Sequence, residues 1–63
     1  MTSRAVIARL REDVRMAVAS RGNHHHFKHP IKPGRVTVLH PKKDLPTGTL
    51  RSIFKQALWS WPP

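Results

Sequence analysis

The sequence predicts an α+β fold in which a three-stranded antiparallel sheet carries both helices on one face. Three observations predict it: an amphipathic helical pattern near each end of the chain, three short strand-like stretches between them, and a glycine-led turn that joins the first two strands. A chain of 63 residues has room for one domain, and such a domain buries only about 60% of its unfolded surface. We therefore expect a single domain over residues 1–63, in the order α-β-β-β-α, with a thin core.

The first predicted element is a helix over about residues 3–14. One face of this helix is apolar and carries Val6, Ile7, Leu10 and Val14. Ser3 is expected to cap the start, because its hydroxyl can accept a hydrogen bond from a free backbone N–H of the first turn. The arginine-rich start has some character of a transit peptide, against which Glu12 and Asp13 count.

Three strands are predicted next, over about residues 16–21, 24–29 and 35–39. Alternation along the first strand places Met16, Val18 and Ser20 on one face. Gly22 and Asn23 then predict a two-residue hairpin turn, because both residues tolerate a positive φ. The third strand is rich in β-branched residues and follows a loop that contains two prolines and a glycine. The three strands are expected to form a meander.

The last predicted element is a helix over about residues 47–58. Its apolar stripe consists of Leu50, Ile53, Phe54, Ala57 and Leu58. Thr47 or its neighbour is expected to cap the start. Trp59 and Trp61 follow where the helix should end, because the two final prolines cannot extend it.

The chain is strongly basic, with 12 lysines and arginines, three aspartates and glutamates, and a formal charge of +9. Such a charge attracts RNA, DNA or an anionic membrane and does not choose among them. The absence of cysteine excludes disulfides and thiolate chemistry and fits a reducing cytosol. No apolar run approaches the roughly 18 residues of a membrane span, and no signal peptide is recognisable. We expect a soluble, cytoplasmic protein.

A glycine-led histidine run in residues 21–29 is the candidate functional site. Histidine can take a proton near neutral pH and surplus cations attract polyphosphate, so together they indicate chemistry on a nucleic acid. Strand alternation places His24 and Phe27 on opposite faces, so His24 faces solvent if Phe27 belongs to the core. The first hypothesis is therefore a small ribonuclease.

Three segments of the chain form a specific combination. They are Arg-Gly-Asn-His-His-His-Phe-Lys-His-Pro at 21–30, Lys-Pro-Gly-Arg-Val-Thr-Val at 32–38, and Asp-Leu-Pro-Thr-Gly-Thr-Leu-Arg-Ser-Ile-Phe-Lys-Gln-Ala at 44–57. In these segments the chain resembles the HicA toxins, small messenger-RNA interferases of type II toxin-antitoxin modules. The resemblance implies a fold like that of the double-stranded RNA-binding domain.

The resemblance also implies a role for His24, the first histidine after the glycine and the small polar residue. The corresponding histidine of the family is catalytic, so we expect His24 to be a general base that takes the proton of a ribose 2′-OH. The ribose oxygen would then attack the adjacent phosphate, and DNA, which lacks this hydroxyl, should not be cleaved. Gly22 and Asn23 would form the supporting turn. No metal and no other cofactor is expected.

Four cations are expected to hold the RNA backbone, from their charge and position: Lys28, Arg35, Lys42 and Lys43. The resemblance further implies a HicB-like antitoxin partner, which would cover the face that bears His24 with an acidic or polar surface. Oligomers could then form through the antitoxin complex.

The chain departs from the family pattern at a few positions. Val14-Arg15 stands where the family commonly has a glycine followed by an aromatic residue, Asn23 where it has serine or aspartate, and Leu58 where it has glycine. The missing glycine at Leu58 removes a usual helix stop. The two tryptophans beyond it could pack on the domain, form a dimer contact or touch the partner.

Other interpretations stay open. A non-catalytic RNA- or DNA-binding module fits the charge and the fold equally well. A cationic amphipathic peptide acting at membranes is suggested by the arginine-rich residues 4–15 and the terminal tryptophans. The adjacent histidines could form a chelating patch, but neighbours on a strand point to opposite faces. His29 and His40 are expected to be loop or surface histidines.

Overall fold

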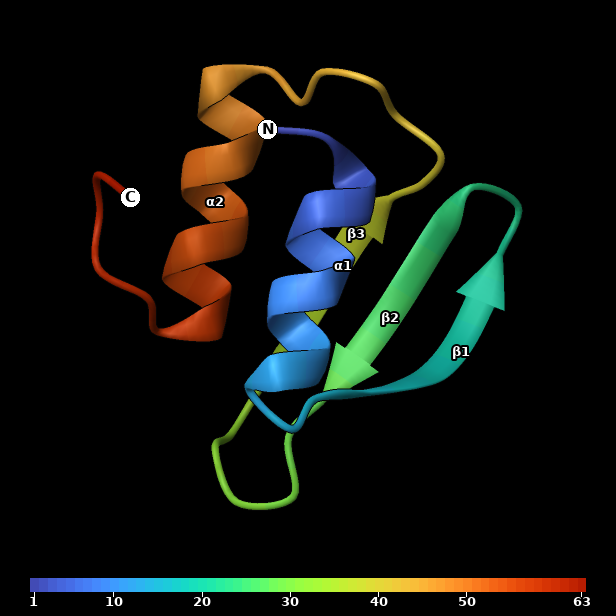
Figure 1. Cartoon of the computed structure of the whole chain (residues 1–63). Helices are drawn as coiled ribbons and strands as arrows, with labels where there is room; N and C mark the ends of the chain where they lie inside the picture. Colours follow the sequence, from blue (N-terminus) through green and yellow to red (C-terminus); the bar gives the residue numbers. More distant parts are fainter.

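The computed structural model describes residues 1–63 and has two helices and three strands. In chain order they are α1 (Ser3–Glu12), β1 (Met16–Arg21), β2 (His24–Lys28), β3 (Arg35–Leu39) and α2 (Thr47–Ala57). The strands form one antiparallel sheet in the order β1-β2-β3. Both helices cover the same face of this sheet, and the other face is open (Figure 1). The predicted α+β class and the α-β-β-β-α order are confirmed.

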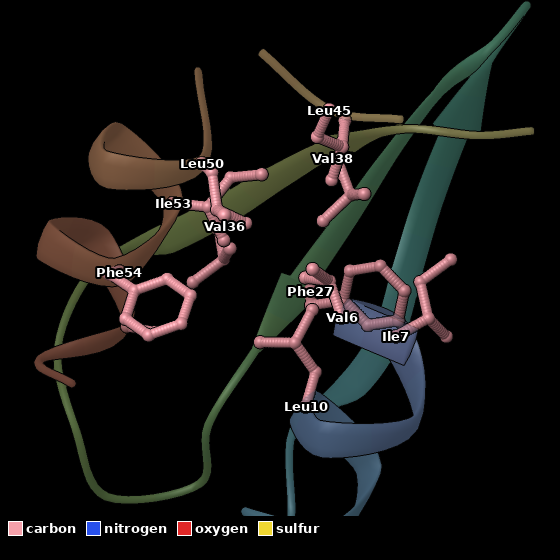
Figure 2. Close-up of a cluster of buried hydrophobic side chains, with 11 residues drawn as sticks. Val6, Ile7, Leu10, Phe27, Val36, Val38, Leu45, Leu50, Ile53 and Phe54 are labelled. Atoms are coloured by element: carbon pink, nitrogen blue, oxygen red, sulfur yellow. The ribbon is translucent and has the colours of Figure 1, made fainter. Parts of the chain in front are cut away.

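The core lies between the two helices and the covered face of the sheet (Figure 2). Its apolar residues come from every element except β1 and, in the case of Leu45, from the loop before α2: Val6, Ile7, Leu10, Phe27, Val36, Val38, Leu45, Leu50, Ile53, Phe54 and Ala57. Side chains alternate between the two faces along a strand. Because Phe27 in β2 and Val36 and Val38 in β3 point into the core, their neighbours along each strand point to the open face. The sheet thus packs one face against the helices and leaves the other face open.

The helix starts differ from the expected caps. The N-cap of α1 is Thr2, whose hydroxyl oxygen accepts from the Ala5 N–H at 3.0 Å. The prediction that Ser3 caps this helix is wrong, because Ser3 is 1% exposed and its hydroxyl is engaged inside the protein. The N-cap of α2 is Pro46, which has no side-chain donor or acceptor, so the expected cap by Thr47 or a neighbour is also wrong.

Both helices end in a Schellman motif, with a left-handed residue just past the helix. In α1 that residue is Val14, at φ 61°, and the N–H groups of Val14 and Arg15 return to carbonyls of the last turn. In α2 it is Leu58, at φ 62°, and Trp59 N–H donates to Phe54 O at 2.9 Å. The helices therefore end before Val14 and Leu58, which are exposed and do not belong to the apolar faces where the pattern placed them.

The edge strand β1 contains a β-bulge. Ala17 and Ala19 pair with consecutive residues of β2, so Val18 between them has no partner. The extra residue reverses the alternation, which turns Ser20 toward the helix side while Met16 faces the open side. The prediction that Met16, Val18 and Ser20 share a face is wrong, because it holds only for a strand without a bulge.

Candidate functional site

The hairpin between β1 and β2 places His24 at the end of the sheet. Gly22 has φ 58° and Asn23 does not have a positive φ, which is the pattern of a type II′ turn with glycine first. This turn sets Arg21 directly opposite His24. The hairpin end is also tied to β3, because the His40 N–H donates to Asn23 O at 2.8 Å. Gly22 and Asn23 therefore form the turn that joins β1 and β2.

The three adjacent histidines separate onto the two faces of the sheet. His24 is exposed on the open face, as expected from the burial of Phe27 at 2% exposure. His26 shares that face, but it is half-buried and its Nδ1 lies 2.8 Å from Thr37 Oγ1. His25 points to the helix side, where its ring meets the ring of His40 edge-on with centroids 5.5 Å apart. His24 is therefore the accessible imidazole of the open face.

The charges on the open face are all positive, and no strand contains an acidic residue. Besides Arg21, the face carries Lys28 and Arg35, which stand directly opposite each other in β2 and β3. Neither forms an ion pair with an acidic side chain. Like charges directly opposite are destabilising in a sheet, so an anion bound between Lys28 and Arg35 would remove a repulsion. Strand geometry separates Lys28 from His24 by roughly 13 Å along β2.

The other two predicted RNA-binding residues, Lys42 and Lys43, lie in the loop after β3. There they line an open hollow of about 830 Å³ between α1, the sheet and this loop, which we term the helix-side hollow. Arg4 and Arg11 of α1 line it as well, and none of its lining residues is acidic. The four predicted cations are thus divided: Lys28 and Arg35 share the open face with His24, and Lys42 and Lys43 do not.

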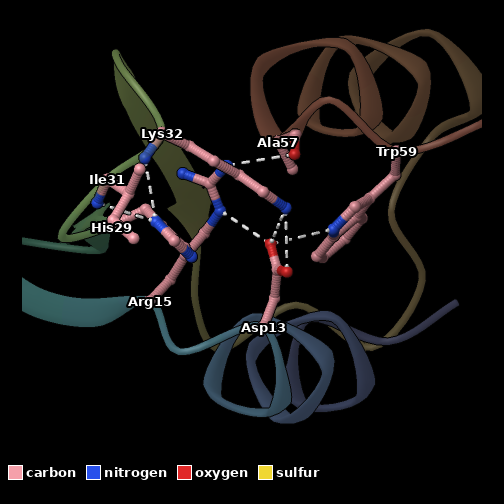
Figure 3. A network of polar contacts seen from close by, with 7 residues as sticks. All are labelled: Asp13, Arg15, His29, Ile31, Lys32, Ala57 and Trp59. Carbon is pink, nitrogen blue, oxygen red and sulfur yellow. Dashed lines mark hydrogen bonds and ion pairs between the residues drawn. The ribbon is translucent and has the colours of Figure 1, made fainter.

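A partly buried ion-pair network lies at the sheet end opposite the hairpin (Figure 3). Arg15 is 1% exposed, donates from Nε to Asp13 Oδ2 at 3.2 Å, and donates from Nη2 to Ala57 O, at the end of α2, at 3.0 Å. Asp13 also accepts from Lys32 Nζ at 3.0 Å and from Trp59 Nε1 at 3.3 Å. Arg15 therefore places a cation at the carboxyl end of α2, where the helix dipole favours a positive charge.

The charge state of Asp13 follows from these contacts. Burial by itself would raise the pKa of the Asp13 carboxyl, but hydrogen bonds from three neighbouring side chains and the charge of Lys32 outweigh it. The pKa of Asp13 is therefore held below its usual value. Lys32 reaches Asp13 from the loop after β2, where its own N–H donates to Nδ1 of the loop histidine His29 at 2.9 Å.

Both C-terminal tryptophans pack on the domain itself. Trp59 and Trp61 each meet the ring of Phe54 edge-on, with centroids 5.2 Å apart. The guanidinium of Arg9 lies 4.5 Å from the centre of the Trp59 ring, a cation–π distance. Of the three roles left open for these residues, the structure shows the first.

The site contains no preformed metal-binding cluster. No three histidine, aspartate or glutamate side chains converge, because His24 and His25 point to opposite faces of the sheet.

The helices are also too short and too polar to cross a bilayer.

Some functional candidates were not identified from the sequence. Arg21 joins the site only because a two-residue turn sets it opposite His24, and the glycine-led turn was the signal that could have identified it. His40 was expected to be a loop or surface histidine, and it does lie in the loop after β3. It is also half-buried, and its Nδ1 lies 2.7 Å from Ser3 Oγ. No local pattern predicts that contact, since 37 positions separate the two residues.

Comparison with known protein families gives one match. A family model described as the HicA toxin of bacterial toxin-antitoxin matches residues 3–59. The match runs from the start of α1 to Trp59, so it contains the hairpin, the open face and the helix-side hollow. No curated protein matches the chain at a significant level.

Proposed function

The chain belongs to the HicA toxin family of bacterial toxin-antitoxin systems, and from that premise we propose that it is an mRNA interferase in which His24 is the general base. Family membership makes it the toxin of such a module and implies an antitoxin partner. The observation that carries the proposal is the position of His24, an exposed imidazole at a hairpin end on a sheet face whose charges are all positive.

The proposed step needs one base, one cation and a ribose. Neutral His24 takes the proton of the 2′-OH, and the 2′ oxygen forms a bond to the adjacent phosphorus. The bond between phosphorus and the 5′ oxygen breaks, and the leaving oxygen takes a proton from the His24 imidazolium or from water. The products are a 2′,3′-cyclic phosphate and a 5′-OH. General-base catalysis of this kind contributes about 10²- to 10⁴-fold in rate.

The neighbouring cations have distinct roles in this proposal. Arg21 pairs directly with His24 across the hairpin, with Cβ atoms roughly 5 Å apart, and would offset the charge that builds on the phosphorane. Lys28 and Arg35 are too far along the sheet to touch the same phosphate, so they would hold a neighbouring one. Such contacts position the RNA backbone without selecting its sequence.

The substrate is a message in the cytoplasm, and the proposed partner is a HicB-like antitoxin. This partner would lie on the open face and present acidic or polar groups to Arg21, Lys28 and Arg35. It would inhibit the toxin by occupying the surface that the RNA needs, and a larger assembly would form through the antitoxin.

The proposal is tested by incubating wild-type and His24→Ala protein with a defined messenger RNA and with DNA of the same sequence, in EDTA. The matched control is His26→Ala, which removes the same side chain two residues away on the same face. Wild type and His26→Ala should cleave the RNA but not the DNA, while His24→Ala should lose at least about 100-fold in rate. Equal cleavage by all three proteins would refute the role of His24. Tight binding without cleavage by wild type would indicate a non-catalytic RNA-binding module.

A further inference from the structure

The helix-side hollow is a second cationic surface that the proposed cleavage step does not use. Four exposed cations surround it, Arg4 and Arg11 from α1 and Lys42 and Lys43 from the loop after β3, and no acidic residue lines it. Its volume, about 830 Å³, is in the range of sites that hold a small organic ligand, roughly 300–1,000 Å³. Charge and size together fit a small polyanion with room for an attached ring.

Two imidazoles give the hollow directed hydrogen-bonding groups. His25 and His40 meet edge-on inside it, and His40 is fixed by the buried Ser3 hydroxyl at 2.7 Å from Nδ1. Ser3 Oγ already accepts the Lys42 N–H at 2.8 Å, so both contacts are satisfied when the Ser3 proton goes to His40 Nδ1. In the tautomer whose Nδ1 accepts this proton, the Nε2–H of His40 can donate to a ligand.

The hollow also has an apolar wall. Its apolar lining consists of Ile7 and Ala8 of α1, Ala17 of β1 and Phe27 of β2. Ala8 and Ala17 are exposed, whereas Ile7 and Phe27 are buried. The accessible apolar surface, chiefly that of Ala8 and Ala17, gives a nucleobase a contact that a free inorganic phosphate cannot use.

We propose that the helix-side hollow binds one nucleotide of the RNA next to the cleaved linkage, with its phosphate between the rim cations and its base on the apolar wall. This inference rests on the proposed function and extends it to a second face of the protein. His24 and His25 are consecutive residues with side chains on opposite faces, so RNA that bends around the hairpin end passes from the active face to the hollow. An acidic protein segment is the rival occupant, and the mixture of cations and an open apolar wall favours the nucleotide.

The test uses a short RNA with 2′-O-methyl riboses, which cannot be cleaved by the proposed step, so binding is measured independently of turnover. The hollow variant is Arg11→Gln with Lys43→Gln, and the matched control is Arg51→Gln with Lys55→Gln, which removes the same charge from α2. Fluorescence anisotropy should show about tenfold weaker binding for the hollow variant and less than threefold for the control. The salt slope should fall by roughly 0.7 for each phosphate of the single strand that the variant no longer neutralises. In NMR spectra, RNA should shift the His25 and His40 ring signals.

Three results would overturn the inference. One is equal RNA affinity of the hollow and control variants, and another is RNA that shifts the His24 signal but leaves His25 and His40 unmoved. The third is a hollow variant that keeps its RNA affinity but binds the antitoxin more weakly, which would make the hollow a protein interface. Failure of the proposed function has a separate signature, the absence of cleavage of unmodified RNA by wild type.

Discussion

At the scale of single residues, two side chains hold a backbone conformation that ordinarily belongs to glycine. Val14 and Leu58 have φ values of 61° and 62°. The left-handed conformation brings Cβ against the following carbonyl and costs an L-residue roughly 1–2 kcal/mol, and a β-branched residue such as valine is a rare occupant. Both side chains are largely exposed, so neither recovers this energy by burial.

We therefore expect Val14→Gly and Leu58→Gly each to raise the free energy of unfolding by about 0.5–1 kcal/mol. The relief of strain exceeds the extra chain entropy that glycine gives to the unfolded state. Urea denaturation followed by circular dichroism measures the change. The control is Val18→Gly, at an exposed valine without a positive φ, which should lower the stability. A loss of stability in both test variants would show that neither position is strained.

These two residues also show what the sequence could and could not predict. Comparison with the family pattern located both positions, because glycine is expected at each. The family pattern did not predict that both helices would still end in a left-handed residue when valine or leucine replaces the glycine, because that outcome depends on tertiary contacts. One such contact is the packing of Trp59 on Phe54, which holds the end of α2 in place.

At the scale of elements, Asp13 joins the end of α1 to β1, to the loop after β2 and to the C-terminal segment. Its pKa in the folded protein lies below the usual value of about 3.9. A lowered pKa means that the ionised carboxylate favours the folded state. The stabilisation is complete above about pH 4 and is lost as the pH falls through the folded pKa.

Asp13→Asn should therefore lower the free energy of unfolding at pH 7 by on the order of 2 kcal/mol, because it leaves buried Arg15 without its counterion. The difference from wild type should shrink as the pH falls below about 4. Unfolding in urea at pH 7 and at pH 2.5 measures both effects. Asp44→Asn is the matched control, since that carboxylate is 91% exposed and should have little effect at either pH. A difference that does not change with pH would contradict the assignment.

Two cations that face each other across β2 and β3 lower the stability of the sheet but favour the binding of an anion. Lys28 and Arg35 repel each other across the open face, so Lys28→Glu should replace a repulsion by an attraction and stabilise the sheet by about 0.5 kcal/mol. The same change should weaken RNA binding and lower its salt slope. Thermal unfolding and anisotropy titrations at several salt concentrations measure the two effects. Lys55→Glu, on α2, is the control, and equal RNA affinity of the two variants would show that the open face does not bind RNA.

At the scale of the whole molecule, the architecture was predictable because the hydrophobic period changes clearly along the chain. Helical spacing at both ends and β-branched alternation in the middle determined the order of elements, and the buried Phe27 determined which face His24 occupies. The helix-side hollow was not predictable, because it joins α1 to a loop about 40 positions away through the Ser3 contacts. The β1 bulge was also missed, since alternation alone contains no signal for an inserted residue.

The whole protein is therefore a thin layered domain with an exposed imidazole on its open face and a cationic hollow on its other side. In the proposed cleavage step, His24 removes the 2′ proton of the ribose at the cleaved linkage. It is tested most directly with an RNA that carries a single 2′-deoxyribose at the mapped cleavage site, beside the unmodified RNA. Wild type should cleave only the unmodified linkage and leave a 2′,3′-cyclic phosphate, while His24→Ala should cleave neither. Cleavage of the deoxy linkage by wild type, or undiminished cleavage by His24→Ala, would contradict it.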